Sequence, residues 1–497
     1  MNIRNFTDAK SLLLDNKSVD QTIFKNTFWL VIAETIQKGI GFLVVVWLAR
    51  CFGPSIYGQW AFALSFVSLF AVLTDFGFST LTVREIARDK SKISQYIDNI
   101  VVMKLILGLI TLGLIVLIIQ FLGKGPEVVK LVYFLGIYIV ISTFTAFFQS
   151  IFRANEKMQY ETICRTVQSL SLLGLISFSI LNKGSILTIS YAYLGAALIG
   201  VIVSLIIIWR YFSRFFLKID LKISKEILRK AWPFGLSIIA VSIYYYLDSV
   251  MLGIMKSNKE VGWYNAAYRI IFLLLVFNRI LISSFFPRLC KCAKEIKFKK
   301  IVDKYSKTTQ FFAWPILLGG FILSDKIIVA IYGNKYSPAI DAFRILLLAV
   351  FLMYINIQGR ILESTERQFL HFKIVVIGAI CNIFFNFLFI PSYGLYGAAW
   401  ATFLTELIVL SIMIFFTKKI FSIYSLLKNS IIPLASSIIM AAWLFLLLNT
   451  PFIQQTFSLY ALLIKFSSGI IIYLFVYFIF EKVSVFLLDK LNKLNNL

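Results

Sequence analysis

Two arginines lie inside one long apolar stretch of this 497-residue sequence, and their spacing suits contact with an anion. Arg269 and Arg279 are ten positions apart, which on an α-helix gives a rise of about 15 Å and a rotation of about 80° between the side chains. A guanidinium group grips phosphate oxygens in a bidentate fashion and keeps its charge when buried. The spacing therefore predicts anion contacts at two depths of one helix, with structural pairing to Asp248 or Asp341 as the alternative. Arg344, near the end of a later apolar stretch, is a further candidate.

Glu34 and Lys38 lie within the first apolar stretch, four residues apart and in the order that favours an ion pair on a helix. Charged side chains at the centre of a membrane helix cost at least ~2.5–3.5 kcal/mol each, so they normally face protein or water. Two interpretations remain open. The two residues either neutralise each other in place, or they line a cavity and exchange partners when a substrate or an ion arrives.

Three further carboxyl groups are candidates for ion coupling, since an intramembrane carboxylate can bind Na+ or carry a proton. Asp75 lies near the end of the second apolar stretch, close to Arg84, and an interfacial ion pair between them is the preferred interpretation. Asp248 and Glu406 lie deeper in their stretches. Together with Glu34 they are the predicted ion-coupling residues, and no cofactor other than Na+ or H+ is predicted.

Aromatic and sulfur-containing residues add weaker signals. Tyr245 is the middle one of three consecutive tyrosines, and its ring could stack on a sugar, although packing against neighbouring helices is the preferred interpretation. Cys290 and Cys292 resemble half of a metal site, but His371 is the one histidine of the chain. The sequence therefore predicts no metal site.

Membrane helices must position these residues, because the chain is far more apolar than a soluble domain. Hydrophobic residues make up 60% of it and the mean hydropathy is +0.86, against an apolar fraction of about 45–50% in soluble domains. At roughly 20 apolar residues per crossing, about fourteen spans fit, which predicts an all-α polytopic membrane protein. The predicted spans are 26–49, 55–77, 97–122, 128–151, 161–181, 187–211, 231–255, 261–286, 308–331, 341–361, 371–390, 394–416, 430–449 and 457–480.

The cations predict the orientation of these spans, since loops on the cytoplasmic side carry an excess of Lys and Arg. Alternate connections hold clusters of cations, for example between Arg288 and Lys307, whereas the intervening connections are nearly bare. The basic connections are therefore predicted to be cytoplasmic, together with both termini. The net charge of +25 is then a topology signal, and no nucleic-acid partner is predicted.

Short motifs recur along the chain and predict a tandem duplication. Gly58, Glu156 and Gly195 return in similar surroundings at Gly262, Glu366 and Gly397, about 202–210 residues later. The predicted organisation is an N-terminal tail (1–25), a first lobe of six spans (26–211), a basic linker (212–230), a second lobe of six spans (231–416), a helix hairpin with its preceding loop (417–480) and a C-terminal tail (481–497). Parallel repeats related by an axis along the membrane normal enclose a central cavity, which is typical of transporters.

Several landmarks together resemble a known family. Leu48 to Pro54 is followed by Tyr57-Gly58, then by Asp75 to Phe78 with Arg84 to Arg88, and later by Tyr246 to Gly253. Their order and spacing over nearly the whole chain resemble the bacterial polysaccharide flippases of the Wzx type. That family belongs to the superfamily of multidrug, oligosaccharidyl-lipid and polysaccharide exporters, which also holds drug/cation antiporters and the lipid II flippase.

The resemblance implies both a fold and a substrate. The fold would be a V-shaped arrangement of two six-helix lobes, similar to that of the MATE transporters, with a helix hairpin outside. The substrate would be an undecaprenyl-pyrophosphate-linked oligosaccharide, flipped by alternating access to the outer leaflet of the bacterial cytoplasmic membrane for O-antigen, capsule or exopolysaccharide synthesis. A polysaccharide polymerase and chain-length machinery would be partners. Sugar-binding positions do not carry over, because they vary with the glycan.

Two rival classes remain. A drug/cation antiporter of the same superfamily would need a negatively charged cavity, whereas the second copy here is basic. A membrane-embedded polysaccharide polymerase or ligase would need a sizeable outer loop, an intramembrane histidine or an acidic pair at the outer face. The sequence shows none of these, so no enzymatic activity is predicted.

Overall fold

Helices make up almost all of the described chain. The computed structural model describes residues 19–212, 216–293, 295–448 and 459–494. Its helices are α2 (Val19–Asp75), α3 (Phe78–Arg88), α4 (Ile93–Phe121), α5 (Pro126–Ala154), α6 (Met158–Leu181), α7 (Ile186–Tyr211), α8 (Leu221–Met255), α9 (Asn258–Cys292), α10 (Phe298–Tyr332), α11 (Ala339–Ile355), α12 (Gln358–Ser364), α13 (Gln368–Thr417), α14 (Ile423–Leu448) and α16 (Leu459–Leu494), with short 3-10 helices η1 (Lys90–Lys92) and η2 (Asn334–Tyr336). The predicted all-α membrane fold is confirmed.

Two of these helices are too long to cross a membrane only once. α2 has 57 residues and α13 has 50, so straight helices would measure about 75–85 Å against about 30 Å of hydrocarbon. Each is interrupted by one glycine with non-helical torsion angles, Gly53 (φ 73°, ψ 174°) and Gly394 (φ 55°, ψ −130°). Twelve segments of the described chain are long and apolar enough to span a membrane. Two of them, those containing α2 and α13, each hold two predicted spans, which agrees with about fourteen crossings.

Several helices extend beyond the ranges that hydropathy predicts. α2 begins within the predicted N-terminal tail, α8 begins within the predicted basic linker, and α16 continues through most of the predicted C-terminal tail. Hydropathy marks only the part of a helix that lies in hydrocarbon, whereas the polar turns beyond it still satisfy their backbone groups within the helix. The short helix α3 lies outside the predicted spans, whereas α12 begins inside the predicted span 341–361, which the structure divides between α11 and α12.

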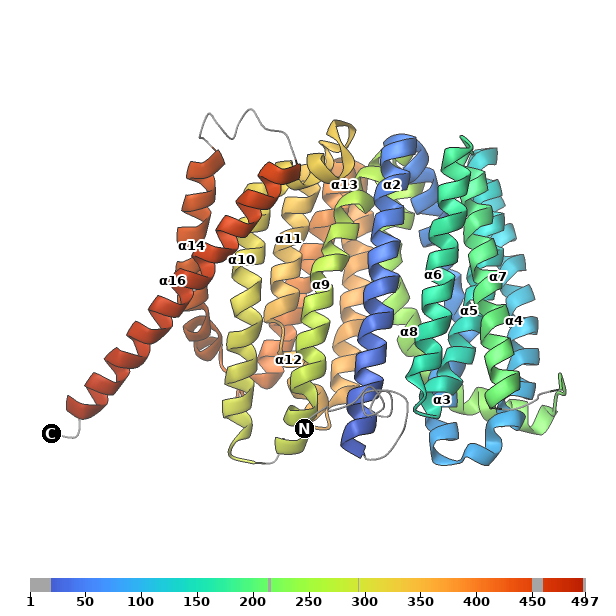
Figure 1. Ribbon diagram of the computed structural model, residues 1–497, viewed down its shortest axis with the longest axis horizontal. Helices are drawn as coiled ribbons and strands as arrows, with labels where there is room; N and C mark the ends of the chain where they lie inside the picture. The colour runs from blue at the N-terminus through green and yellow to red at the C-terminus, as the bar shows by residue number, and fades with distance from the viewer. Residues whose placement is uncertain (1–18, 213–215, 294, 449–458, 495–497) are drawn as a thin grey trace, which may run out of the picture. The chain divides into compact units, whose positions relative to one another are not determined.

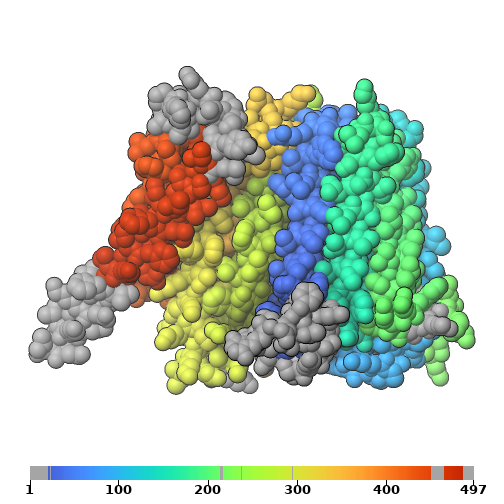
Figure 2. All heavy atoms as spheres, in the orientation of Figure 1, coloured from blue at the N-terminus to red at the C-terminus, as the bar shows by residue number. Residues whose placement is uncertain are grey.

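The chain divides into two compact units, Met1–Val250 and Met251–Leu497. In the first unit α2 packs against α4, α5 and α6, and α7 packs against α5 and α6, so that these helices run side by side (Figure 1). α2 and α6 form neighbouring stripes on the surface of this unit (Figure 2). α2 is thereby brought next to α5 and α6, which follow it much later in the sequence.

The beginning of α8 packs within the first unit. The Asn99 side-chain oxygen on α4 accepts hydrogen bonds from the Asp220 backbone N–H at 2.7 Å and from the Ser224 hydroxyl at 3.1 Å. Ile227 and Ala231 belong to the same buried apolar cluster as α4 and α5. The sequence repeat nevertheless assigns this helix to the second copy. A helix can belong to the second sequence repeat and still pack within the first compact unit. The predicted lobe boundaries, 26–211 and 231–416, therefore stay a prediction.

The second unit repeats the helix contacts of the first. The pairs α9–α11, α10–α11 and α11–α13 correspond, in chain order, to α2–α5, α4–α5 and α5–α7, which supports the predicted duplication. The additional helices α14 and α16 pack against each other and against α10. Leu323 of α10 shares a buried cluster with Met440 and Leu444 of α14 and Tyr473 of α16. The predicted hairpin is therefore attached to this unit through α10.

Alanine at Gly394 is expected to lower the melting temperature more than alanine at Gly53. Both glycines have a positive φ, which costs an L-residue roughly 1–2 kcal/mol. A Cβ at Gly394 would also collide with the Glu260 carboxylate, whose Oε2 accepts a hydrogen bond from the Leu395 N–H at 3.0 Å. At Gly53 an added Cβ meets no described atom within 4 Å. Thermal melting of the two purified variants measures the difference, and equal melting temperatures would show that Glu260 moves aside without cost.

Candidate functional site

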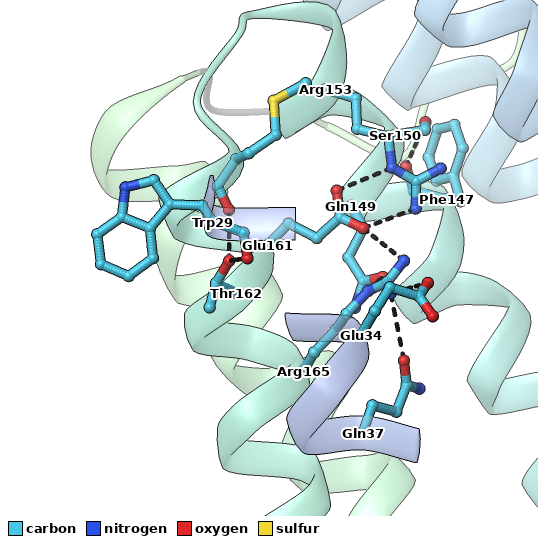
Figure 3. Close-up of polar contacts among 11 residues, drawn as sticks. Trp29, Glu34, Gln37, Phe147, Gln149, Ser150, Arg153, Glu161, Thr162 and Arg165 are labelled. Carbon is cyan, nitrogen blue, oxygen red and sulfur yellow. Dashed lines mark hydrogen bonds and ion pairs between the residues drawn. The ribbon is translucent and has the colours of Figure 1, made fainter. Parts of the chain in front are cut away.

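Charged and amide side chains from three apolar helices meet in the first unit (Figure 3). Two of these helices are linked by a further polar contact, because the Thr162 hydroxyl of α6 donates to the Trp29 carbonyl oxygen of α2 at 2.8 Å. We call this group the Arg153–Arg165 cluster; it consists of Glu34 and Gln37 of α2, Gln149 and Arg153 of α5, and Glu161 and Arg165 of α6.

Glu161 is the centre of the cluster, and its side chain is fully buried. Arg153 binds it in a bidentate manner, with Nε to Oε2 and Nη2 to Oε1 each at 2.8 Å. Arg165 reaches the same carboxylate from the other side, with Nη2 at 2.6 Å from Oε1. Two guanidinium groups thus share one buried carboxylate, and paired charges are what an apolar interior requires.

Arg165 also binds the remaining members of the cluster. Its Nη1 donates to Glu34 Oε1 at 3.0 Å and to Gln37 Oε1 at 3.2 Å. Its Nε donates to Gln149 Oε1 at 3.3 Å. Glu34 was predicted to pair with Lys38 along the same helix, whereas the structure places Arg165 of a different helix on its carboxylate. Sequence spacing predicts only pairs on the same helix, so it could not predict this contact between α2 and α6.

Exposure increases from the centre of the cluster outward. The exposed fraction of the side chain is 0% for Glu161, 14% for Arg165, 34% for Arg153 and 48% for Glu34. Lys38, on the same stretch of α2 as Glu34, is also exposed. Charged groups on membrane helices almost always face protein or water, so the exposed side of the cluster is suited to contact with water and with a polar ligand. Planar guanidinium donors favour a carboxylate or phosphate group as that ligand.

Asp75 belongs to a second buried ion pair of the first unit. Its Oδ1 lies 3.0 Å from the Nζ of Lys104, whose side chain is fully buried on α4, and it accepts a hydrogen bond from the Ser79 hydroxyl at 2.6 Å. The expected pair with Arg84 is wrong, because Arg84 binds its neighbour Glu85 at 2.9 Å. The fold brings α4 next to the end of α2, which the linear order of residues does not show.

The predicted residues of the second unit are dispersed over several helices. Arg344 of α11 binds Asp341 at 2.9 Å and the Ser324 hydroxyl at 2.7 Å, so Asp341 serves Arg344 rather than the two arginines of α9. On α9, Arg269 is half-buried and Arg279 is exposed. Glu406 of α13 is buried, whereas the half-buried Tyr245 and the buried Asp248, both of α8, lie in the first unit.

One element of the cluster recurs in the second unit. Glu156 and Glu366, recognised as a repeated motif, are both turn residues with positive φ, 56° and 62°. A polar contact spans each turn: the ion pair of Arg153 with Glu161 in the first unit, and in the second a contact of 3.0 Å between Glu363 Oε1 and His371 Nδ1. The second pair stands 210 residues after the first (153 to 363, 161 to 371), with the carboxylate before the turn in place of after it.

Sequence reasoning singled out Glu34 but missed Arg153, Glu161 and Arg165. The last two lie near the start of a predicted span, 161–181, and Arg153 lies just after the end of 128–151, where charged residues are unremarkable. The repeated turn could have revealed them. Polar residues stand at equivalent positions on both sides of the two turns, which is a reason to look for a contact across each turn.

The fold is shared with solved membrane transporters. The lipid II flippase MurJ, in an inward closed conformation, superposes with a TM-score of 0.76 at 18% identity, covering 92% of this chain and 99% of that chain. An inward-facing multidrug resistance MATE family transporter of the MOP superfamily gives a TM-score of 0.64 at 17% identity, covering 82% of this chain and 99% of that chain. The class is therefore a polytopic membrane protein with the MOP-superfamily fold.

The family follows from the sequence itself. The family described as "Polysaccharide biosynthesis protein" matches residues 23–293, more than half of the chain, and the protein belongs to that family. The putative O-antigen transporter of Shigella dysenteriae is 22% identical over 403 residues, covering 78% of this chain and 98% of the relative. The lipopolysaccharide biosynthesis protein WzxC of Escherichia coli K12 is 22% identical over 449 residues, covering 87% and 86%. The probable low-salt glycan biosynthesis flippase Agl15 of Haloferax volcanii is 22% identical over 386 residues, covering 76% and 80%. The resemblance stated from the sequence is confirmed.

Proposed function

We propose that this protein is a flippase that moves an undecaprenyl-pyrophosphate-linked oligosaccharide from the cytoplasmic to the outer leaflet of a bacterial cytoplasmic membrane. The observation that carries the proposal is the Arg153–Arg165 cluster, which presents guanidinium donors at the exposed side of three apolar helices. Membership of the polysaccharide biosynthesis family, and relatives whose names include O-antigen transporter and glycan flippase, support it.

The physical task of such a protein is to carry a pyrophosphate and several sugar hydroxyls past hydrocarbon. Neither group can cross without compensating hydrogen bonds and charges. The polyprenyl tail can stay in the bilayer, so only the headgroup needs protein contacts. In this proposal the lobes of residues 26–211 and 231–416 alternate access to the two leaflets, both termini are cytoplasmic, and the substrate leaves chemically unchanged for a polymerase and the chain-length machinery.

The membrane potential supplies part of the driving force in this proposal. It is worth ~2.3 kcal/mol per charge per 100 mV, and an inside-negative potential favours outward movement of an anionic headgroup. Coupling to Na+ or H+ would need an additional carboxyl group. Glu34 and Asp75 already hold cationic partners in Arg165 and Lys104. The proposal for ion coupling therefore centres on Glu406, whose side chain is 7% exposed, and Asp248 stays a candidate.

Arg269→Ala and Arg279→Ala are each expected to lower glycan export about tenfold or more, because a hydrogen-bonded contact to a charged group contributes about 1.5–3 kcal/mol. Complementation of a flippase-null strain, scored by surface glycan at matched membrane abundance, measures the effect. Arg88→Ala, at an exposed position of α3, is the matched control. Full complementation by both α9 variants would contradict their role as anion contacts.

The same strain tests the function itself. A flippase-null strain that carries this protein should regain surface glycan and should stop accumulating lipid-linked oligosaccharide in its inner leaflet. A drug/cation antiporter would instead raise drug resistance on overexpression without changing surface glycan. That second outcome would overturn the proposed function.

A further inference from the structure

Glu34 differs from the other carboxylate of the Arg153–Arg165 cluster in how easily it can be replaced. Glu161 is fully buried and receives three bonds from two guanidinium groups. Glu34 is 48% exposed, and one of its carboxylate oxygens accepts a hydrogen bond from Arg165 Nη1. An exposed ion pair of this kind is worth only about 0–1 kcal/mol. Glu34 is therefore the ligand that an incoming anion can displace.

Arg165 would stay in place if Glu34 moved away. Glu161 holds its Nη2 at 2.6 Å and Gln149 holds its Nε at 3.3 Å, so the plane of the guanidinium is fixed by buried partners. The Nη1 group would then still donate to Gln37 Oε1. The position that Glu34 had occupied would be open to another hydrogen-bond acceptor. A phosphate oxygen is the same kind of acceptor for a guanidinium as the carboxylate oxygen that it would replace.

The charge balance of the cluster agrees with such an exchange. Arg153 and Arg165 carry two positive charges against the single negative charge of Glu161, and Glu34 supplies the second negative charge. Removing Glu34 from Arg165 leaves an excess of one positive charge, which one ionised phosphate of the headgroup would offset. The displaced carboxylate stays in water, with Lys38 one turn further along α2.

We propose that the phosphate of the lipid-linked substrate displaces the Glu34 carboxylate from Arg165, so that Glu34 acts as a built-in competitor that occupies the headgroup site of the empty transporter. This inference rests on the proposed function and names the atoms that receive the substrate. It implies selectivity, because a neutral lipid has no acceptor strong enough to replace a carboxylate on a guanidinium.

Binding of farnesyl pyrophosphate to the purified full-length protein in lipid nanodiscs tests the exchange. This probe carries a prenyl pyrophosphate and no sugar. Glu34→Gln removes the competing charge and is expected to bind the probe about five- to tenfold more tightly than the unmodified protein. Arg165→Gln is expected to bind it at least tenfold more weakly. Glu127→Gln, exposed in the first turn of α5, is the matched control and should bind as the unmodified protein does.

Farnesol, which lacks the charged group, should show no difference between the unmodified protein and Glu34→Gln. Equal or weaker pyrophosphate binding by Glu34→Gln would overturn the proposal, and so would the absence of pyrophosphate binding to every one of these proteins. Glu34 contacts the cluster from its exposed side, so the decisive variant is expected to keep its melting temperature, which the same preparation can verify.

Failure of this inference can be distinguished from failure of the proposed function. If Glu34→Gln does not bind the probe more tightly while the protein still restores surface glycan to a flippase-null strain, only the exchange is wrong. If the protein restores no surface glycan, the proposed function fails irrespective of how the probe binds.

Discussion

Glu161→Ala is expected to abolish glycan export and to destabilise the protein by about 3–5 kcal/mol, the usual cost of breaking a buried ion pair by removing one partner. The carboxylate of Glu161 is fully buried between Arg153 and Arg165. Without it, two positive groups would face each other on apolar helices, and Arg165 would lose its fixed orientation. Thermal melting of the purified protein and surface glycan in a complemented null strain measure the two effects.

The control for this experiment is Glu127→Ala, which removes an exposed carboxylate from the other end of α5. It should melt and export as the unmodified protein does. The double variant Arg153→Ala with Glu161→Ala should be less destabilised than the sum of the two single variants, since contacting charges couple by about 0.5–3 kcal/mol. Strict additivity, or a Glu161→Ala variant as stable as the control, would show that the cluster does not hold α5 and α6 together.

The fold was largely predictable because a membrane restricts the possible structures. Backbone groups in hydrocarbon must be satisfied internally, so each apolar stretch of about 20 residues becomes a helix. The spans predicted at 128–151 and 187–211 lie within α5 and α7. Hydropathy could not show that the connections near Gly53 and Gly394 are single non-helical residues within long helices. Those breaks depend on backbone torsion angles that glycine permits, but a glycine in the sequence does not by itself show that it adopts them.

The site was less predictable, because its contacts join helices that are far apart in the chain. Arg165 lies 131 residues after Glu34, and spacing rules connect only positions three or four residues apart on one helix. The sequence singled out Glu34 as an unusual charge and paired it with Lys38, whereas the structure places Arg165 of another helix on its carboxylate. For Asp75 the error was of the same kind, since its partner on α4 is 29 residues away. A single sequence identifies charges that need partners and leaves open which partners the packing supplies.

A second set of variants can measure separately how much stability is lost when Asp75 or Lys104 loses its partner. Lys104 is fully buried, whereas the Asp75 side chain is 15% exposed and also holds the Ser79 hydroxyl. The nearby rings of Phe144 and Phe147 lie 5.5 and 6.0 Å from the ammonium group. A desolvated cation–π contact contributes on the order of 2 kcal/mol, less than the about 3–5 kcal/mol lost when a buried ion pair loses one partner. The aromatic rings therefore cannot replace the carboxylate as the partner of a buried charge.

Asp75→Asn is accordingly expected to destabilise the protein by about 3–5 kcal/mol, because it leaves the Lys104 ammonium buried without a counter-charge. Lys104→Met is expected to cost less, since the remaining carboxylate is partly exposed and keeps Ser79 as a donor. Combining the two substitutions removes both charges and should recover most of the stability lost in Asp75→Asn, as replacement of a whole buried pair by neutral groups often does. Melting temperatures of the three purified variants give the order. If the double variant is no more stable than Asp75→Asn, the cost comes from lost packing at the end of α2 rather than from an uncompensated charge on α4.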